Sequence, residues 1–381
     1  MLQPCRPIED SRPDRFRPPH CPWPECPSGE AGAKFRWTRA GWYTRGCDPR
    51  RRVPRLLCST CRRTFSRQSF ASTYYLKRPE LLLPVAAGLV AGSAHRQIAR
   101  SLGCAPSTVT RLSARLGRIA LLLQAEALSE LDGLDEPIVF DHFETFAFSQ
   151  DDRLGIGTAV GQRSWFVYTF DPAPHRRAGR RSALRRAPTR PLPESAPGSV
   201  VRSTRRVLDT LRRLTPDCLQ LVTDDHPAYR SAVRGLLGSI EHQIYPNPPR
   251  GPGADLEVVR QRDRAMFAVD LLHKLKRHTQ AHHRRETIAF GRRSNAILER
   301  TALMAVWRNF IKKVSERRSD PVTPAMRAGL TDRVWSWADV CSKRRFPGRI
   351  SLPGGWAKVY RRGWITPAVG RNQIHQLRHA F

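Results

Sequence analysis

Three acidic residues have the local surroundings of carboxylates that share a divalent metal ion. Asp141 lies inside an apolar, strand-like run at 137–146, and Asp224 ends a second such run at 218–224. Glu299 lies near the start of a long helical pattern. A buried carboxylate is unfavourable unless it is paired or bound to a metal, and oxygen ligands suit Mg²⁺ or Mn²⁺. We therefore predict a metal site that cleaves and joins phosphodiesters.

Other acidic residues compete with each of these three. Glu144 falls on the face of the predicted strand opposite to Asp141, and Asp225 lies beyond the end of its run. Glu299 precedes an apolar helical stripe by one turn, which places it on the core-facing side. The competing interpretation of Glu299 is an ion pair with an arginine at the helix start. If that holds, Glu286 is the first alternative for the third acid.

Four cysteines near the N-terminus are spaced as two pairs of metal ligands. The pairs are Cys21 with Cys26 and Cys58 with Cys61. Tetrahedral Zn²⁺ needs four such ligands, and a tight turn points both thiolates of a pair at one ion. The pattern predicts a zinc ribbon, with Cys47 or His20 as alternative fourth ligands. The competing interpretation is a set of reduced, unligated cysteines in a reducing compartment.

The segment after the cysteines has the spacing of a helix-turn-helix. Residues 79–131 read as helical, and within 95–112 the small Ala99 allows two helices to cross closely. Gly103 can take the positive φ of the turn. The residues predicted to face a major groove are Ser107, Thr108, Thr110, Arg111 and Arg115. The competing interpretation is a helical hairpin with no role on DNA.

From residue 137 onward the predicted elements follow the order strand, strand, strand, helix, strand, helix, strand. The predicted strands are 137–148, 154–160, 164–170, 219–223 and 240–245, and the helices between them are 200–214 and 227–237. This order is typical of an RNase H-like core with a mixed five-stranded sheet and covering helices. Residues 171–199 lack periodicity and are predicted to form a basic loop, and helical patterns return at 262–284 and 295–317.

The composition indicates a nucleic-acid partner. The 381 residues carry 66 Lys plus Arg against 33 Asp plus Glu, which gives a formal net charge of +33. Such an excess favours DNA, because bound cationic groups release counterions from phosphates. The sequence shows neither an apolar run that would span a bilayer nor a signal peptide. We therefore expect a cytoplasmic, nucleoid-associated protein with no membrane partner.

The ordered set of motifs resembles the DDE transposases of bacterial insertion sequences that carry an N-terminal zinc ribbon and a helix-turn-helix. The resemblance rests on the two cysteine pairs with 61–65, on 97–112, on 139–141, on 223–229 and on 285–300. In that family the second acid commonly opens an Asp-Gly-His-x-x-Tyr motif, and here Asp225 stands in place of the glycine. The resemblance implies Mg²⁺-dependent cleavage at the element ends and strand transfer into target DNA, by a homodimer or a higher oligomer.

These features divide the chain into four predicted units. They are a zinc ribbon with its leader (1–75), a helix-turn-helix domain (76–132), an RNase H-like DDE domain (133–318) and a basic C-terminal region (319–381). We expect most of the C-terminal tryptophans to pack against the core. The leading functional hypothesis is a DNA transposase. The alternative is a DNA-binding regulator derived from a transposase, without cleavage activity.

Overall fold

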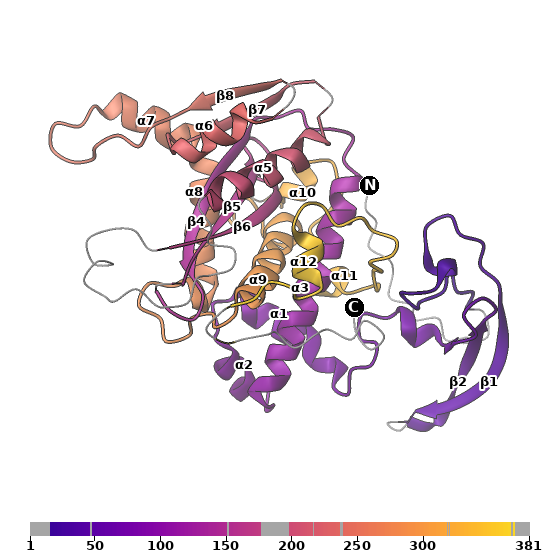
Figure 1. Cartoon of the computed structure of the whole chain (residues 1–381). Helices are drawn as coiled ribbons and strands as arrows, with labels where there is room; N and C mark the ends of the chain where they lie inside the picture. Colours follow the sequence, from indigo (N-terminus) through magenta and orange to yellow (C-terminus); the bar gives the residue numbers. More distant parts are fainter. Residues whose placement is uncertain are drawn as a thin grey trace.

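Figure 1 shows the computed structural model of the protein, which describes most of the chain. The described residues are 16–45, 48–150, 152–176, 198–215, 217–236, 239–317, 319, 321–366 and 369. Cys47 and the larger part of the predicted basic loop lie outside these residues. None of the described helices is both long enough and apolar enough to cross a membrane.

The N-terminal unit is a three-stranded antiparallel sheet. Its strands β1 (Trp37–Arg45), β2 (Asp48–Cys58) and β3 (Thr64–Phe65) lie in the order β1-β2-β3. Short 3-10 helices at Pro27–Gly29 and Arg67–Phe70 flank the strands. In Figure 1 the long β1–β2 hairpin stands beside the body that holds the other elements.

Three helices follow the ribbon after a 3-10 turn at Pro79–Leu81. They are α1 (Leu82–Val90), α2 (His95–Ser101) and α3 (Pro106–Ser129). The turn between α2 and α3 contains Gly103 at a φ of 56°, which favours glycine. Pro106 begins α3, where its missing N–H has no intrahelical partner to lose. Two helices joined by a glycine-containing turn therefore lie where the helix-turn-helix is predicted, and α3 continues for 24 residues.

The central element is a five-stranded mixed sheet with the order β6-β5-β4-β7-β8. Its strands are β4 (Ile138–Phe146), β5 (Asp152–Gly161), β6 (Val167–Arg176), β7 (Leu219–Thr223) and β8 (Ile240–Ile244). β4, β5 and β6 form an antiparallel meander, whereas β7 runs parallel to β4 and β8 runs parallel to β7. This arrangement is compatible with an RNase H-like core.

One predicted boundary in this sheet was wrong. Residues 171–176 were assigned to the basic loop, but they continue β6, and Arg176 is opposite Asp152 of β5. The two prolines in this stretch, Pro172 and Pro174, obscured the strand. β6 is an edge strand, where a residue without an N–H is tolerated.

Helices cover the sheet and extend to the C-terminus. The helices of the core are α5 (Ser199–Arg212), α6 (Pro227–Arg234), α7 (Leu256–Ala265), α8 (Phe267–Thr279) and α9 (Ser294–Val306). A 3-10 turn at Ala281–His283 follows α8, and α9 ends in a π turn at Trp307–Ile311, before the predicted end of this helix. The short C-terminal helices are α10 (Pro324–Arg327), α11 (Trp337–Val340) and α12 (Trp356–Tyr360).

A single hydrophobic core joins the helix-turn-helix, the sheet and the C-terminal region. It runs from Leu81 to Trp364 and includes the buried C-terminal residues Trp335 and Trp356. The expectation that these tryptophans pack against the core is confirmed. Gly117 of α3 lets the two long helices approach, because an added Cβ would lie 2.5 Å from the Cβ of Glu299 on α9. Within this body, α3 is a structural helix as well as part of the helix-turn-helix.

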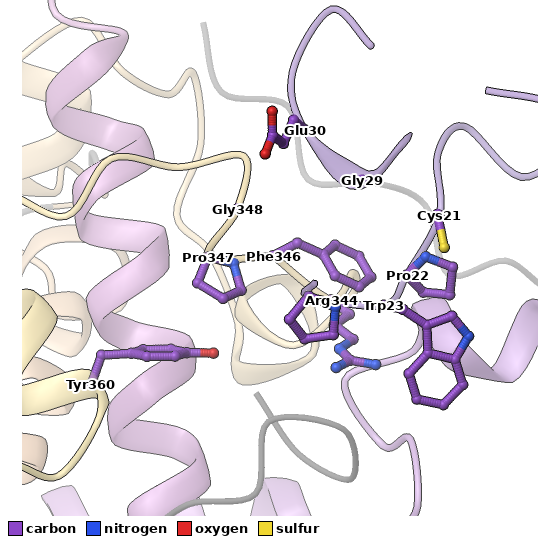
Figure 2. A pocket seen from close by; sticks show the side chains of 11 residues that line it. Cys21, Pro22, Trp23, Gly29, Glu30, Arg344, Phe346, Pro347, Gly348 and Tyr360 are labelled. Carbon is purple, nitrogen blue, oxygen red and sulfur yellow. The ribbon is translucent and has the colours of Figure 1, made fainter. Parts of the chain in front are cut away.

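The C-terminal region also completes the small core of the ribbon. Phe346 packs there beside Phe70, and its ring centroid lies 4.6 Å from that of His20. Arg349 donates a hydrogen bond to the carbonyl of Glu30 at 2.9 Å. Figure 2 shows the crevice that remains between the N-terminal unit and the C-terminal region. Cys21 and the residues near it line one side of this crevice. The ribbon is therefore fastened to the body by a segment from the other end of the chain.

Candidate active site

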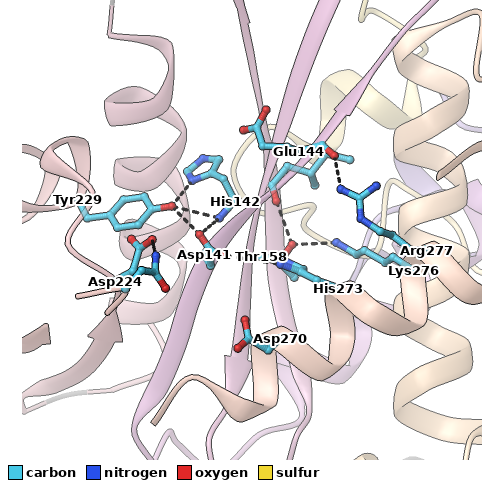
Figure 3. Close-up of polar contacts among 12 residues, drawn as sticks. Asp141, His142, Glu144, Thr158, Asp224, Tyr229, Asp270, His273, Lys276 and Arg277 are labelled. Atoms are coloured by element: carbon cyan, nitrogen blue, oxygen red, sulfur yellow. Dashed lines mark hydrogen bonds and ion pairs between the residues drawn. The ribbon is translucent and has the colours of Figure 1, made fainter. Parts of the chain in front are cut away.

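The register of two parallel strands brings Asp141 and Asp224 to the same level. β4 pairs with β7 so that Val139 is opposite Val222. Asp141 lies two residues after Val139, and Asp224 lies two residues after Val222. Both carboxylates therefore lie beside each other on β4 and at the end of β7, in the middle of the sheet. The sequence predicted acids on neighbouring strands. Figure 3 shows the two side chains on neighbouring segments, with α8 facing them.

Asp141 is held by hydrogen bonds to one of its two oxygens. Its Oδ1 accepts from the backbone N–H of His142 at 2.7 Å and from the hydroxyl of Tyr229 at 3.0 Å. Its Oδ2 lies 3.6 Å from Nδ1 of His273. Burial, together with the negative charge of Asp224, raises the pKa of Asp141 to about 7, although the two hydrogen bonds oppose this rise.

Asp224 is fixed by the turn that follows β7. Its Oδ1 accepts from the backbone N–H of His226, and its Oδ2 accepts from Nδ2 of Asn247, both at 3.1 Å. His226 is in turn the N-cap of α6, because its ring accepts from the backbone N–H of Ala228. The second carboxylate is thereby tied to the first turn of a helix.

Helix α8 adds a third carboxylate and a buried cation. Asp270 points from α8 toward the acid pair in Figure 3 and contributes to the raised pKa of Asp141. It also forms an ion pair with Arg262. Lys276, two turns further along, is buried and donates to Oγ1 of Thr158 at 2.9 Å. Burial lowers the pKa of Lys276 to about 7, and the charge of Asp141 opposes this shift.

Reasoning from the sequence missed these α8 residues. Asp270, His273 and Arg277 recur at helical spacing of three and four, which places them on one side of a helix with apolar neighbours. That polar row on a helix following the fifth strand was the available signal. Asp270 in particular was not among the acids that we weighed.

The structure places Glu299 elsewhere and contradicts its assignment as the third metal ligand. Glu299 is 1% exposed in the interface between α3 and α9. Its carboxylate lies 3.0 Å from Nε of Arg362 and 3.9 Å from a guanidinium nitrogen of Arg118, and it accepts from Nδ2 of Asn295 at 3.1 Å. The apolar stripe correctly predicted that this side of α9 is buried. At Glu299, however, α9 packs against α3 and not against the sheet that carries the acid pair. Glu299 is therefore in an ion pair, as the competing interpretation expected, but its partners are Arg118 of α3 and Arg362, which follows α12, and not an arginine at the start of its own helix.

The other competing acids also lie away from the pair. Glu144 faces His175, with 3.1 Å between Oε2 and Nε2, as its position on the opposite strand face predicts. Asp225 forms an ion pair with Arg230. Glu286 is exposed, in the segment between α8 and α9.

The four predicted cysteines form a compact cluster. Their sulfur atoms all lie within 4.8 Å of one another, with Cys21 and Cys61 at 3.7 Å and Cys26 and Cys58 at 3.8 Å. A tetrahedral zinc ion with Zn–S distances of about 2.3 Å places its sulfurs roughly 3.8 Å apart, so the cluster fits this metal. The alternative ligand His20 instead uses Nδ1 in a contact with the carbonyl of Cys21 at 3.0 Å.

Replacement of Cys58 by serine is therefore expected to abolish binding of one zinc ion per chain. The hydroxyl is a poor substitute for a thiolate, and a cluster with three cysteines binds zinc far more weakly. Atomic absorption on purified protein measures the zinc content. Cys218→Ser is the matched control, because Cys218 is exposed and outside the cluster. Equal zinc content in the Cys58→Ser protein and the wild type would contradict the assignment.

The predicted DNA-facing residues of α3 divide into two groups. Ser107, Thr110 and Arg111 are exposed and Thr108 is partly exposed, so they remain predicted contacts. Arg115 is 5% exposed and donates to the carbonyls of Ser72 and Tyr74 at 2.9 and 2.8 Å. The prediction for Arg115 was wrong, because the segment leading from the ribbon covers this face of α3.

The acid pair fits a divalent cation held by few protein ligands. Among the described residues, the cysteine set is the one group of three or more such ligands whose atoms converge within 4.8 Å. Asp141, Asp224 and Asp270 therefore do not form a closed cage. Mg²⁺ commonly binds through one or two carboxylates and keeps several waters, which matches two facing carboxylates. Burial first, and the charge of Asp224 second, raise the pKa of Asp141, and a cation beside the two acids would favour its ionised form.

Comparisons with known proteins add little to this geometry. No family model and no curated protein matches the chain. Among solved structures, one match is a chain of the "CryoEM structure of simian T-cell lymphotropic virus intasome in complex with PP2A regulatory subunit B56 gamma". The identity is 14%, the TM-score is 0.24, and the match covers 66% of this chain and 74% of that chain. A TM-score this low supports no argument, so function has to be inferred from this chain's own residues.

Proposed function

We propose that this protein is a DNA transposase, which cleaves phosphodiesters at the ends of a DNA element and joins those ends to target DNA. The observation that carries the proposal is the pair Asp141 and Asp224, level with each other on neighbouring parallel strands of the five-stranded sheet. The formal net charge of +33 supports a DNA partner. The cysteine cluster and the helix-turn-helix support recognition of a particular DNA end.

In this proposal Asp141 and Asp224 hold a divalent cation, and Asp270 approaches from α8 as the third carboxylate. When bound, Mg²⁺ or Mn²⁺ supplies Lewis-acid stabilisation of charge on a phosphoryl oxygen. Asp270 takes the role first assigned to Glu299, because α8 faces the acid pair whereas Glu299 is enclosed between α3 and α9. Lys276 lies buried behind the carboxylates, and the charge of Asp141 favours its protonated form against the effect of burial.

The reaction proposed at this site consists of two displacements at phosphorus. Attack by water at the element end breaks the P–O3′ bond and frees a 3′-hydroxyl. That hydroxyl then attacks a target phosphodiester, which forms one new P–O bond and releases the target's own 3′-hydroxyl. Each step exchanges one P–O bond for another, so neither an oxidant nor a reductant is needed. We propose that the protein acts as a homodimer or higher oligomer, with Ser107, Thr108, Thr110 and Arg111 contacting the DNA.

Replacement of Asp270 by asparagine tests this assignment of the acids. We expect cleavage in Mg²⁺ to fall by about 10²–10³-fold, because several kcal/mol of transition-state stabilisation depend on the bound metal. The assay uses labelled duplexes that span the DNA on either side of the protein's gene. Asp263→Asn is the matched control, since Asp263 also pairs with Arg262 but lies on α7. Normal cleavage by the Asp270→Asn protein would show that another group supplies the third ligand.

One observation favours the alternative of a DNA-binding regulator without cleavage activity. The three carboxylates do not converge to ligand distance, and Asp270 is engaged by Arg262. A regulator would bind the same duplexes and leave them intact at every concentration of Mg²⁺ or Mn²⁺. The cleavage assay therefore separates the two functions directly.

A further inference from the structure

Tyr229 links the helix that follows Asp224 to the carboxylate of Asp141. It belongs to α6, whose first turn begins three residues after Asp224. The turn is stiff, because Asp224 accepts from the N–H of His226 and Pro227 begins the helix. From this turn the hydroxyl of Tyr229 reaches across to β4 and donates to Oδ1 of Asp141 at 3.0 Å. Figure 3 shows this reach between the two strands.

The ring of Tyr229 is held on several sides. It is 2% exposed, and its centroid lies 5.2 Å from that of Phe140 in an edge-to-face arrangement. It stacks on the ring of His142 at 5.6 Å with an interplanar angle of 12°. His226 approaches from the N-cap with its ring centroid at 5.1 Å. A ring packed in this way cannot swing about its Cα–Cβ bond, so the position of its hydroxyl is well defined.

The hydroxyl also has partners that fix the direction of its hydrogen bond. It accepts from the backbone N–H of His142 at 3.1 Å and lies 3.0 Å from Nδ1 of the same residue. The phenol donates to Asp141, and this direction is the one that a metal-bound Asp141 needs, because an ionised carboxylate can only accept. Oδ1 of Asp141 is thereby occupied by two donors, whereas Oδ2 faces His273 and α8.

We infer that Tyr229 is a positioning residue, which orients the Asp141 carboxylate for a divalent cation and sets its place relative to Asp224. This inference rests on the proposed function, in which Asp141 is a metal ligand. Hydrogen-bond partners of a metal ligand orient it, and their loss lowers metal affinity by about 10–100-fold. The general packing role of a buried tyrosine would not have this effect, because phenylalanine keeps the ring.

Tyr168 of β6 offers a matched control. It is 3% exposed, and its hydroxyl donates to Oε1 of Glu136 at 2.8 Å, away from the acid pair. Tyr168→Phe and Tyr229→Phe therefore each remove one buried hydroxyl that donates to one carboxylate. Both variants are expected to lose a similar, modest amount of stability, whereas metal affinity should change in one of them alone.

The test is calorimetric titration of the zinc-loaded full-length protein with MnCl₂, without DNA. We expect the wild type and Tyr168→Phe to bind Mn²⁺ equally, Tyr229→Phe to bind about 10-fold more weakly, and Asp141→Asn to lose the site. Equal affinity of Tyr229→Phe and the wild type, with binding lost in Asp141→Asn, would overturn the role of Tyr229 and leave the acid pair intact. Binding that Asp141→Asn does not affect would overturn both the role of Tyr229 and the metal site of the proposed function.

Discussion

The Asp141→Asn protein is expected to lose DNA cleavage by at least about 10³-fold and, without added metal, to be more stable than the wild type above pH 7. Loss of cleavage follows from removal of one of the two carboxylates that we propose as ligands of the cation. The gain in stability follows from the fold itself. Burial and the charge of Asp224 raise the pKa of Asp141 to about 7, from an ordinary value of 3.8.

The direction of this pH dependence follows from the proton count. Between about pH 4 and pH 7, Asp141 is protonated in the folded protein and ionised in the unfolded chain. Stability of the wild type therefore falls as pH rises through this window and levels off above it. Asparagine carries no charge, so the stability advantage of the variant grows from near zero at pH 4 to roughly 4 kcal/mol at most at pH 8, at about 1.4 kcal/mol per pKa unit.

Urea unfolding of EDTA-treated protein across this pH range measures the effect. Asp135→Asn is the control, because Asp135 precedes the same strand but is 99% exposed. Added Mg²⁺ should then stabilise the wild type and leave the Asp141→Asn protein unchanged. If the difference in unfolding free energy between the Asp141→Asn protein and the wild type is constant from pH 4 to pH 8, the fold does not raise the pKa of Asp141.

Replacement of Glu299 by glutamine is expected to destabilise the protein by about 3–5 kcal/mol, the usual consequence of breaking a buried ion pair. Glutamine keeps the shape of the side chain but removes the negative charge between the buried guanidinium group of Arg118 and the partly buried one of Arg362. The substitution weakens the packing of α3 against α9, which joins the predicted helix-turn-helix to the core. Metal affinity of the molecules that remain folded should be unchanged.

Denaturant unfolding together with Mn²⁺ titration separates the two possible roles of Glu299. Glu316→Gln is the control, because Glu316 pairs with Lys312 on the surface and its loss should change stability by less than about 1 kcal/mol. A Glu299→Gln protein as stable as the wild type, but unable to bind Mn²⁺, would restore Glu299 to the metal site.

The placement of Asp141 and Asp224 on neighbouring strands could be predicted because strand patterns are local, whereas their role as metal ligands stays a prediction. Asp141 and Asp224 each follow an apolar run, and the predicted element order already placed those runs on neighbouring strands. The parallel register, with Val139 opposite Val222, then determines that the two acids are level. The cluster of four cysteines was predictable for a similar reason, because their spacing as two close pairs indicates it.

The errors arose where a side chain's neighbour comes from a distant part of the chain. Periodicity showed that Glu299 lies on the buried side of its helix, but it could not show that α3 covers that side. Arg115 has helical spacing consistent with a groove-facing position, yet the carbonyls of Ser72 and Tyr74 bind it. Asp270 could not be predicted as a neighbour of Asp141, because its position depends on how α8 packs against the sheet.

The most direct test of the central claim is cleavage of labelled duplexes that span the DNA on either side of the gene, by wild-type protein in MgCl₂ and in EDTA. We predict a nicked product with a 3′-hydroxyl in MgCl₂, and none in EDTA or with the Asp141→Asn protein. Duplexes that are bound but remain intact in both MgCl₂ and MnCl₂, or cleavage that persists in EDTA, would contradict the assignment of a metal-dependent DNA-cutting centre at Asp141 and Asp224.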